Sequence, residues 1–99
     1  MSEDNAISPE LEQALPETRE RIGSVPAEVV VTNHAMGLYE LAAIHLTAEP
    51  VRLAEAALAI DAFACLVDVL GERLGDAHET LASALAALRM AYVSLAKPQ

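Results

Sequence analysis

The sequence predicts an all-α fold: a small three-helix unit in which the second and third helices form an antiparallel hairpin and a second copy completes the packing. Apolar residues recur every three or four positions along most of the chain, which is the helical period. Hydrophobic residues make up 54% of the 99 residues but aromatic residues only 3%. Ala and Leu, which favour helices, therefore fill the apolar positions in place of the β-branched and aromatic residues that strands prefer.

Residues 1–24 differ from the rest of the chain. They contain six acidic residues, two arginines and two prolines, and few large apolar side chains. Such a segment buries too little apolar surface to offset the entropy of ordering. We expect a largely disordered acidic tail over residues 1–24 and a single helical domain over residues 25–99.

The first helix is expected from Pro26 to about Thr47, because proline suits the first helical turn. Its apolar side carries two imidazoles, His34 and His45. We expect both to be core or interface residues with one satisfied hydrogen bond. The candidate partners are Tyr39, Tyr92, Asp61 and Asp68, or their copies across a dimer. The alternative is a pH-responsive interface, because histidine titrates near neutral pH. The residues expected to share this side are Val30, Val31, His34, Leu38, Leu41, Ala42 and His45.

The second helix is expected from Pro50 to about Leu74, and it is apolar nearly all round, which predicts burial on nearly all sides. The lone Cys65 is interpreted as a small buried hydrophobic residue. Heptad-spaced positions are Leu53, Ala57, Ile60, Ala64, Val67, Gly71 and Leu74; Phe63, Leu66 and Leu70 extend one flank; Leu58, Cys65 and Val69 lie on another; Asp61, Asp68 and Glu72 form a narrow polar strip.

The third helix is expected to follow a tight turn. Gly75 suits a helix C-terminus, and Asp76 with Glu79 has the spacing of a capping box. Arg89 lies beside the apolar stripe of this helix, and its expected ion-pair partners are Asp61 and Asp68. The apolar stripe itself consists of Leu81, Leu85, Leu88, Tyr92 and Leu95.

Two neighbours cannot easily cover the many-sided second helix in a chain of this size. Exposed apolar surface of that extent marks an interface, and a two-fold dimer is the commonest arrangement, so we expect a homodimer. The candidates for core or oligomer interface are Leu53, Ile60, Phe63, Val67, Leu70, Leu85, Leu88 and Tyr92.

Several function classes are disfavoured. A net charge of −9 with six scattered basic residues opposes binding to nucleic acid and to anionic membranes. The apolar run of the second helix is interrupted by Asp61 and Asp68, so it is not a membrane span. With no apolar signal core at the acidic N-terminus, we expect a cytoplasmic protein.

No enzymatic site and no cofactor are expected. Asp61 and Asp68 are about 10 Å apart along one helix, too far to share a proton. His34 and His45 are roughly 16 Å apart, too far to bind one metal ion from a single helix. No glycine-rich phosphate loop is present.

The segments VPAEVVVTNHAMGLYELAAIHL, IDAFACLVDVL and LASALAALRMAYV, in this order, resemble the bacterial family known as domain of unknown function 1844, over residues 25–95. The resemblance implies a small all-helical unit and brings no catalytic residues. Because members are often encoded near translation genes, including that of initiation factor three, it also implies a link to translation.

The expected function is a non-enzymatic interaction or accessory protein that acts as a helical oligomer. One alternative is a binder of small apolar ligands, with a slot between the first and second helices lined by His34, Leu38, Leu41, Phe63 and Cys65. The other alternative is a purely structural oligomer.

Overall fold

The computed structural model describes residues 8–10, 19–20 and 23–97. From residue 23 to residue 97 the chain forms three long α-helices: α2 (Ala27–Leu46), α3 (Leu53–Leu70) and α4 (Ala77–Ala96). A single 3₁₀ turn, η2 (Gly71–Leu74), joins α3 to α4. The predicted all-α, three-helix fold is confirmed. Most of the acidic tail expected over residues 1–24 lies outside the described ranges, so that expectation stays a prediction.

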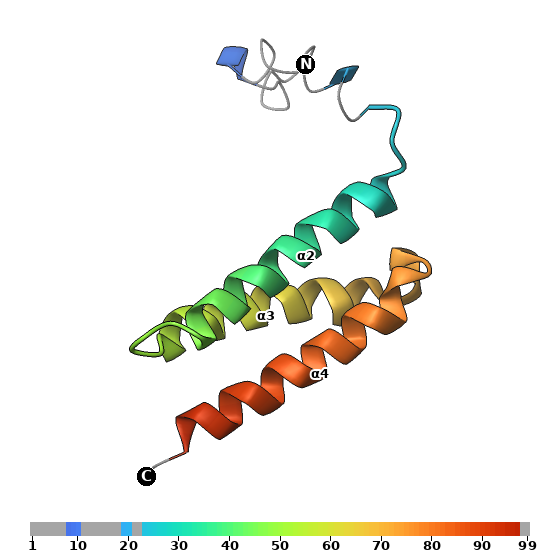
Figure 1. Ribbon diagram of the computed structural model, residues 1–99. Coiled ribbons are helices and arrows are strands. Elements are labelled where there is room, and N and C mark those ends of the chain that lie inside the picture. Colours follow the sequence, from blue (N-terminus) through green and yellow to red (C-terminus); the bar gives the residue numbers. More distant parts are fainter. Residues whose placement is uncertain (1–7, 11–18, 21–22, 98–99) are drawn as a thin grey trace.

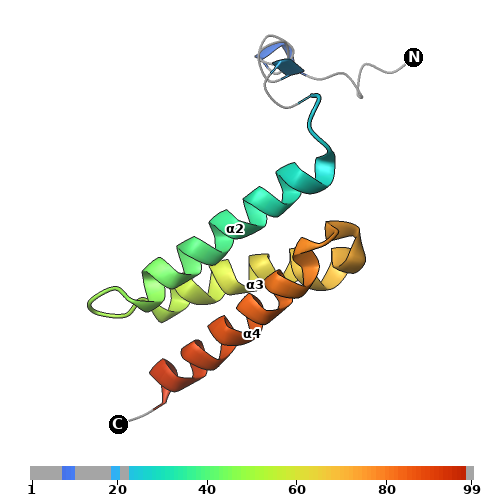
Figure 2. The ribbon, with the colours of Figure 1, turned by 45° about the vertical axis from the view of Figure 1, so that its right-hand side comes forward.

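The three helices pack in turn against one another, with α3 behind and between the other two (Figure 1). The 47–52 connection lies at one end of α3 and η2 at the other, so the chain reverses direction at both turns (Figures 1 and 2). The C-terminal half of α4 draws away from α3 in both views.

The first helix begins and ends close to where the sequence predicts. Pro26 precedes it and accepts a hydrogen bond from the backbone N–H of Val29. At the other end the Thr47 hydroxyl donates to the carbonyl oxygen of Ala43 at 2.8 Å. The same hydroxyl lies 3.3 Å from the carbonyl oxygen of Ile44, one of the carbonyls that a helix C-terminus leaves without an intrahelical partner.

The second helix is shorter than predicted. Its α-helical part ends at Leu70, because Gly71 adopts φ +52°, a left-handed conformation that stops an α-helix. The chain then forms η2, and Gly75 at φ +73° ends this turn as predicted. The prediction that Gly71 continues the heptad pattern of the second α-helix is therefore wrong.

The predicted capping box at the start of α4 does not form. Asp76 makes no side-chain capping hydrogen bond, and its backbone is already helical, with φ −62° and ψ −21°. A capping residue needs an extended backbone so that its side-chain oxygen can reach the N–H groups of the first turn. Because Asp76 follows the 3₁₀ turn with a helical backbone, its side chain does not cap α4.

The core consists of one apolar cluster shared by the three helices and η2. The Tyr39 and Phe63 rings lie 6.0 Å apart at 57°, a tilted contact between α2 and α3. On these two helices many of the buried residues are alanines, whose small side chains allow close helix packing. The buried residues are Ala35, Ala42, Leu46, Ala56, Ala59, Ile60, Phe63, Ala64, Val67, Leu74, Leu81, Leu85 and Leu88.

The residues predicted as candidates for core or oligomer interface divide into two groups. Ile60, Phe63, Val67, Leu85 and Leu88 are buried, while Leu53, Leu70 and Tyr92 are half-buried against the same cluster. Phe63, which the sequence placed on a flank of its helix, is completely buried.

The buried face of α2 is rotated from the predicted one. The helix turns Ala35, Ala42 and Leu46 towards the core, so His34 and Leu41 at the centre of the predicted stripe are exposed. Alanines permit a closer approach to α3 than the bulkier stripe would, which favours this rotation. Among the helices that the structure describes, none combines the length and the apolar character needed to cross a bilayer.

Candidate interaction surfaces

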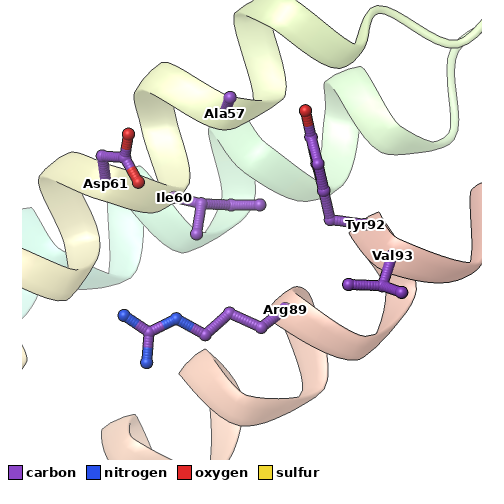
Figure 3. A pocket seen from close by; sticks show the side chains of 6 residues that line it. All are labelled: Ala57, Ile60, Asp61, Arg89, Tyr92 and Val93. Atoms are coloured by element: carbon purple, nitrogen blue, oxygen red, sulfur yellow. The ribbon is translucent and has the colours of Figure 1, made fainter. Parts of the chain in front are cut away.

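A groove of about 380 Å³ lies between the N-terminal half of α3 and the C-terminal half of α4. Over this stretch the ribbon of α4 diverges from that of α3 (Figure 1). The residues that line it come equally from the two helices (Figure 3): Ala57, Ile60, Asp61, Arg89, Tyr92 and Val93. Its walls are mainly apolar, with an acid on one side and a base on the other.

An ion pair crosses from α4 to α3 beside this groove. Arg89 Nη2 lies 3.7 Å from Asp68 Oδ2, and the two side chains are 55% and 61% exposed. The predicted pairing of Arg89 with the acidic strip of α3 is thus confirmed for Asp68. At this distance and exposure the pair contributes less than about 1 kcal/mol to stability. The guanidinium is held only weakly and is free to meet another carboxylate.

Asp61 and Lys97 have no ion-pair partner within residues 23–97. Asp61 stands on the α3 wall of the groove (Figure 3). Lys97 lines a second depression, of about 420 Å³, on the outer side of the end of α4 together with Arg89, Met90, Val93 and Ser94. Unpaired charges beside apolar surface are typical of the rim of a protein interface.

A further groove, of about 270 Å³, lies on the other side of the end of α4, against α2. Its lining is Tyr39, Ala43, Leu46, Thr47, Ala87, Leu88, Ala91 and Leu95. The last turns of α4 are therefore flanked by hollows on both sides. Most helical stability in proteins comes from tertiary packing, and this segment has little of it within the chain.

Large apolar side chains are exposed on all three helices. On α3, Leu58, Cys65 and Val69 follow one another at four- and seven-residue steps, so they share one outer face. Leu58 is 71% exposed and Met90 on α4 is 75% exposed. The full set among the described residues is Val25, Val29, Met36, Leu41, Ile44, Leu58, Val69, Met90, Val93 and Leu95. Exposure on this scale marks interaction surfaces.

Neither histidine has the partner that the sequence predicts. His34 is exposed, and its Nδ1 lies 2.8 Å from the Val30 carbonyl oxygen one turn earlier in the same helix. That contact is a local hydrogen bond in which the ring N–H donates. His45 is half-buried, and its Nδ1 is buried without a partner among the described residues. Within one chain the predicted pairing with Tyr39, Tyr92, Asp61 or Asp68 is therefore wrong. Pairing with the same residues of a second copy stays a prediction.

The predicted ligand slot between the first two helices does not form. Phe63 is completely buried, whereas Cys65 two residues later is exposed on the opposite side of α3. Residues two apart lie about 200° apart around a helix and cannot line one slot. His34 and Leu41 are exposed as well, which leaves only Leu38 half-buried beside Phe63. The prediction that Cys65 is a buried hydrophobic residue is wrong for the same reason.

The structure also adds residues that sequence reasoning missed. Met90, Val93 and Lys97 border the hollows around the end of α4, although the sequence had marked only its opposite, leucine-rich stripe. These three residues are spaced three and four positions apart, which places them on one helix face, and this pattern could have identified them from the sequence. Within the described ranges, no group of three His, Cys, Asp or Glu side chains is placed to hold a metal ion.

In comparisons with protein-family models, curated proteins and solved structures, none matched this chain. The likeness to domain of unknown function 1844 therefore stays a sequence-based expectation.

Proposed function

We propose that this protein is a non-enzymatic interaction or accessory protein of the cytoplasm that acts as a helical oligomer, most simply a homodimer. The observation that carries the proposal is the display of large apolar side chains on the outer faces of all three helices. Their exposure in a chain whose core is already well filled indicates that part of this surface is covered when the protein works.

The number of exposed side chains is large enough to support association. Burying one large aliphatic side chain contributes about 1.5–3 kcal/mol. Association of two molecules costs roughly 4–15 kcal/mol in lost translational and rotational freedom. Covering one or two of these side chains would therefore not suffice, whereas covering one helix face from both copies offsets that cost. A two-fold interface doubles every such contact.

Sedimentation velocity at micromolar concentration tests the oligomer. We expect a species of at least twice the 10.5 kDa chain mass. A mass of one chain, unchanged up to the highest concentration reached, would refute the oligomer. The experiment needs the full chain, because the acidic residues 1–24 add to the charge that opposes association.

Co-purification from the native cell separates an accessory protein from a purely structural oligomer. A purely structural oligomer retains only its own copies. An accessory protein retains a second protein in constant proportion through the exposed helix faces. The link to translation rests on the family resemblance alone, and reproducible recovery of ribosomal or initiation-factor peptides is the result it requires.

The ligand-binding alternative has lost the slot that motivated it, because Phe63 and Cys65 face opposite sides of α3.

A further inference from the structure

The helices that form the α3–α4 groove carry opposite charges. Helix α3 contains Glu55, Asp61 and Asp68 and no basic residue between its ends. From Thr80 to Lys97, by contrast, the chain has Arg89 and Lys97 and no acidic residue at all. This is an unusual segment in a protein of net charge −9 with 15 acidic residues.

Within one chain these opposite charges make few contacts with one another. One ion pair joins the two helices within residues 23–97, and it is long and exposed. Because α4 diverges from α3 (Figure 1), Asp61 lies at the edge of an open groove (Figure 3). Lys97 directly follows the last residue of α4. An acidic wall is thus left without a base, and a basic helix end is left without an acid.

The apolar parts of the two surfaces match as well. The end of α4 exposes Met90 and Val93 beside its basic residues. The groove offers Ala57, Ile60 and Tyr92 between its charged edges. A basic, apolar helix end is therefore exposed in the same molecule that has an apolar groove with an unpaired acid, Asp61, on its α3 wall.

We propose that the groove between α3 and α4 receives the C-terminal end of α4 from a second copy of this chain. In a two-fold dimer each copy supplies one helix end and one groove, so the contact is made twice. Lys97 of the second copy lies beside Asp61, and the apolar side chains of its α4 cover those of the groove. This inference rests on the proposed oligomer and names its interface.

The mixed charge of the groove favours this occupant over the acidic segment of the same chain. Residues 1–24 contain six acidic residues and two arginines, so Asp61 and Asp68 would repel them on balance. A second α4 end brings positive charge to that wall. Its last turns are ordered in helix α4, so binding them costs little further backbone entropy.

Charge reversal on the two sides of the interface gives a sharp test. Asp61→Lys and Lys97→Glu each place like charges together at both contacts of a homodimer. Each variant alone should self-associate at least about tenfold more weakly than the wild type. An equimolar mixture of the two should recover wild-type affinity, because both contacts of the mixed dimer then pair opposite charges. Neither substitution touches the Arg89–Asp68 pair of the single chain.

Matched controls separate this local effect from net charge. Glu40→Lys changes the net charge as Asp61→Lys does, and it lies on an exposed position of α2. Arg73→Glu matches Lys97→Glu and lies at the far end of α3, in η2. The dimerisation affinity of each control should change only as far as its altered net charge requires. An equimolar mixture of the two controls should show no recovery of affinity comparable to that of the Asp61→Lys and Lys97→Glu mixture. Circular dichroism of every variant confirms that the helices are intact.

The outcomes distinguish this interface from the proposed function. If both reversed variants associate like their charge-matched controls, the groove is not the interface, although an oligomer through another face stands. If the wild type is a monomer, the oligomer and its interface fail together. If deletion of residues 1–22 converts a wild-type monomer into a dimer that Asp61→Lys disrupts, the groove is occupied by the chain's own N-terminal segment and the proposal is overturned.

Discussion

The carboxylate of Glu28, at the start of α2, fills the space beside Gly75 where a Cβ atom would stand. Gly75 also has φ +73°, which side chains rarely adopt. This contact brings the beginning of the first long helix against the turn that precedes α4. It places a negative charge near the N-terminus of α4, where the helix dipole stabilises it.

Substituting the two left-handed glycines should therefore have unequal effects. Gly71→Ala meets open space, so it should cost only the penalty of a sparsely populated positive-φ conformation, about 1–3 kcal/mol. Gly75→Ala carries the same penalty and also displaces the Glu28 carboxylate, which should add roughly 0.5 kcal/mol. Denaturant unfolding at matched protein concentration measures both. In a Glu28→Ala background the difference should vanish; if it persists, the Glu28 contact is not its cause.

Phe63→Ala should destabilise the fold severely, by about 3–5 kcal/mol, because it removes a completely buried ring and leaves a cavity beside Tyr39. For a domain of this size that is a large part of the total stability. Leu58→Ala is the matched control on the same helix, since that side chain is 71% exposed and should change the unfolding free energy by less than about 0.5 kcal/mol. Similar losses for the two would contradict the burial that separates them.

His45→Leu should stabilise the protein by roughly 1 kcal/mol. Its Nδ1 is buried without a hydrogen-bond partner among the described residues, and an unpaired buried polar atom costs about 1–3 kcal/mol. His34→Leu, which exchanges only an exposed ring bonded to its own helix, should change little. Thermal melts of the two variants compare them directly. A clear loss of stability for His45→Leu would show that its ring nitrogen does have a partner in solution.

Gly37→Ala should raise the stability of α2 by about 0.5–1 kcal/mol, because glycine in a helix interior is entropically costly and an added Cβ meets no atom within 4 Å. The mass in sedimentation should stay that of the wild type, since Gly37 lies outside the α3–α4 groove. Weaker association of this variant would instead implicate the outer face of α2.

The sequence by itself determined the helical class, the approximate bounds of the first helix, the turn before the third helix and most of the core. These features follow from local rules: Pro26 starts a helix, Gly75 ends one, and the leucines of α4 recur at helical spacing. Ile60, Val67, Leu85 and Leu88 are buried because an apolar face must find another apolar face. The sequence also predicted Asp68 as an ion-pair partner of Arg89, because Asp68 belongs to the narrow polar strip of the second helix.

Only the tertiary structure decided how each helix turns about its axis and where the helices separate. On α2 several faces are apolar enough to be buried, and close packing of Ala35 and Ala42 selects one of them, which exposes His34 and Leu41. A periodicity analysis ranks the faces of a helix by hydrophobicity. It does not take into account that a face of small side chains allows two helices to pack closer together. The divergence of α4, which leaves Asp61 facing an open groove and Met90 uncovered, depends likewise on the turn at Gly71 and Gly75. The direction in which a helix leaves such a turn is set by packing across the whole core, because no local pattern in α4 encodes the distance to its neighbours.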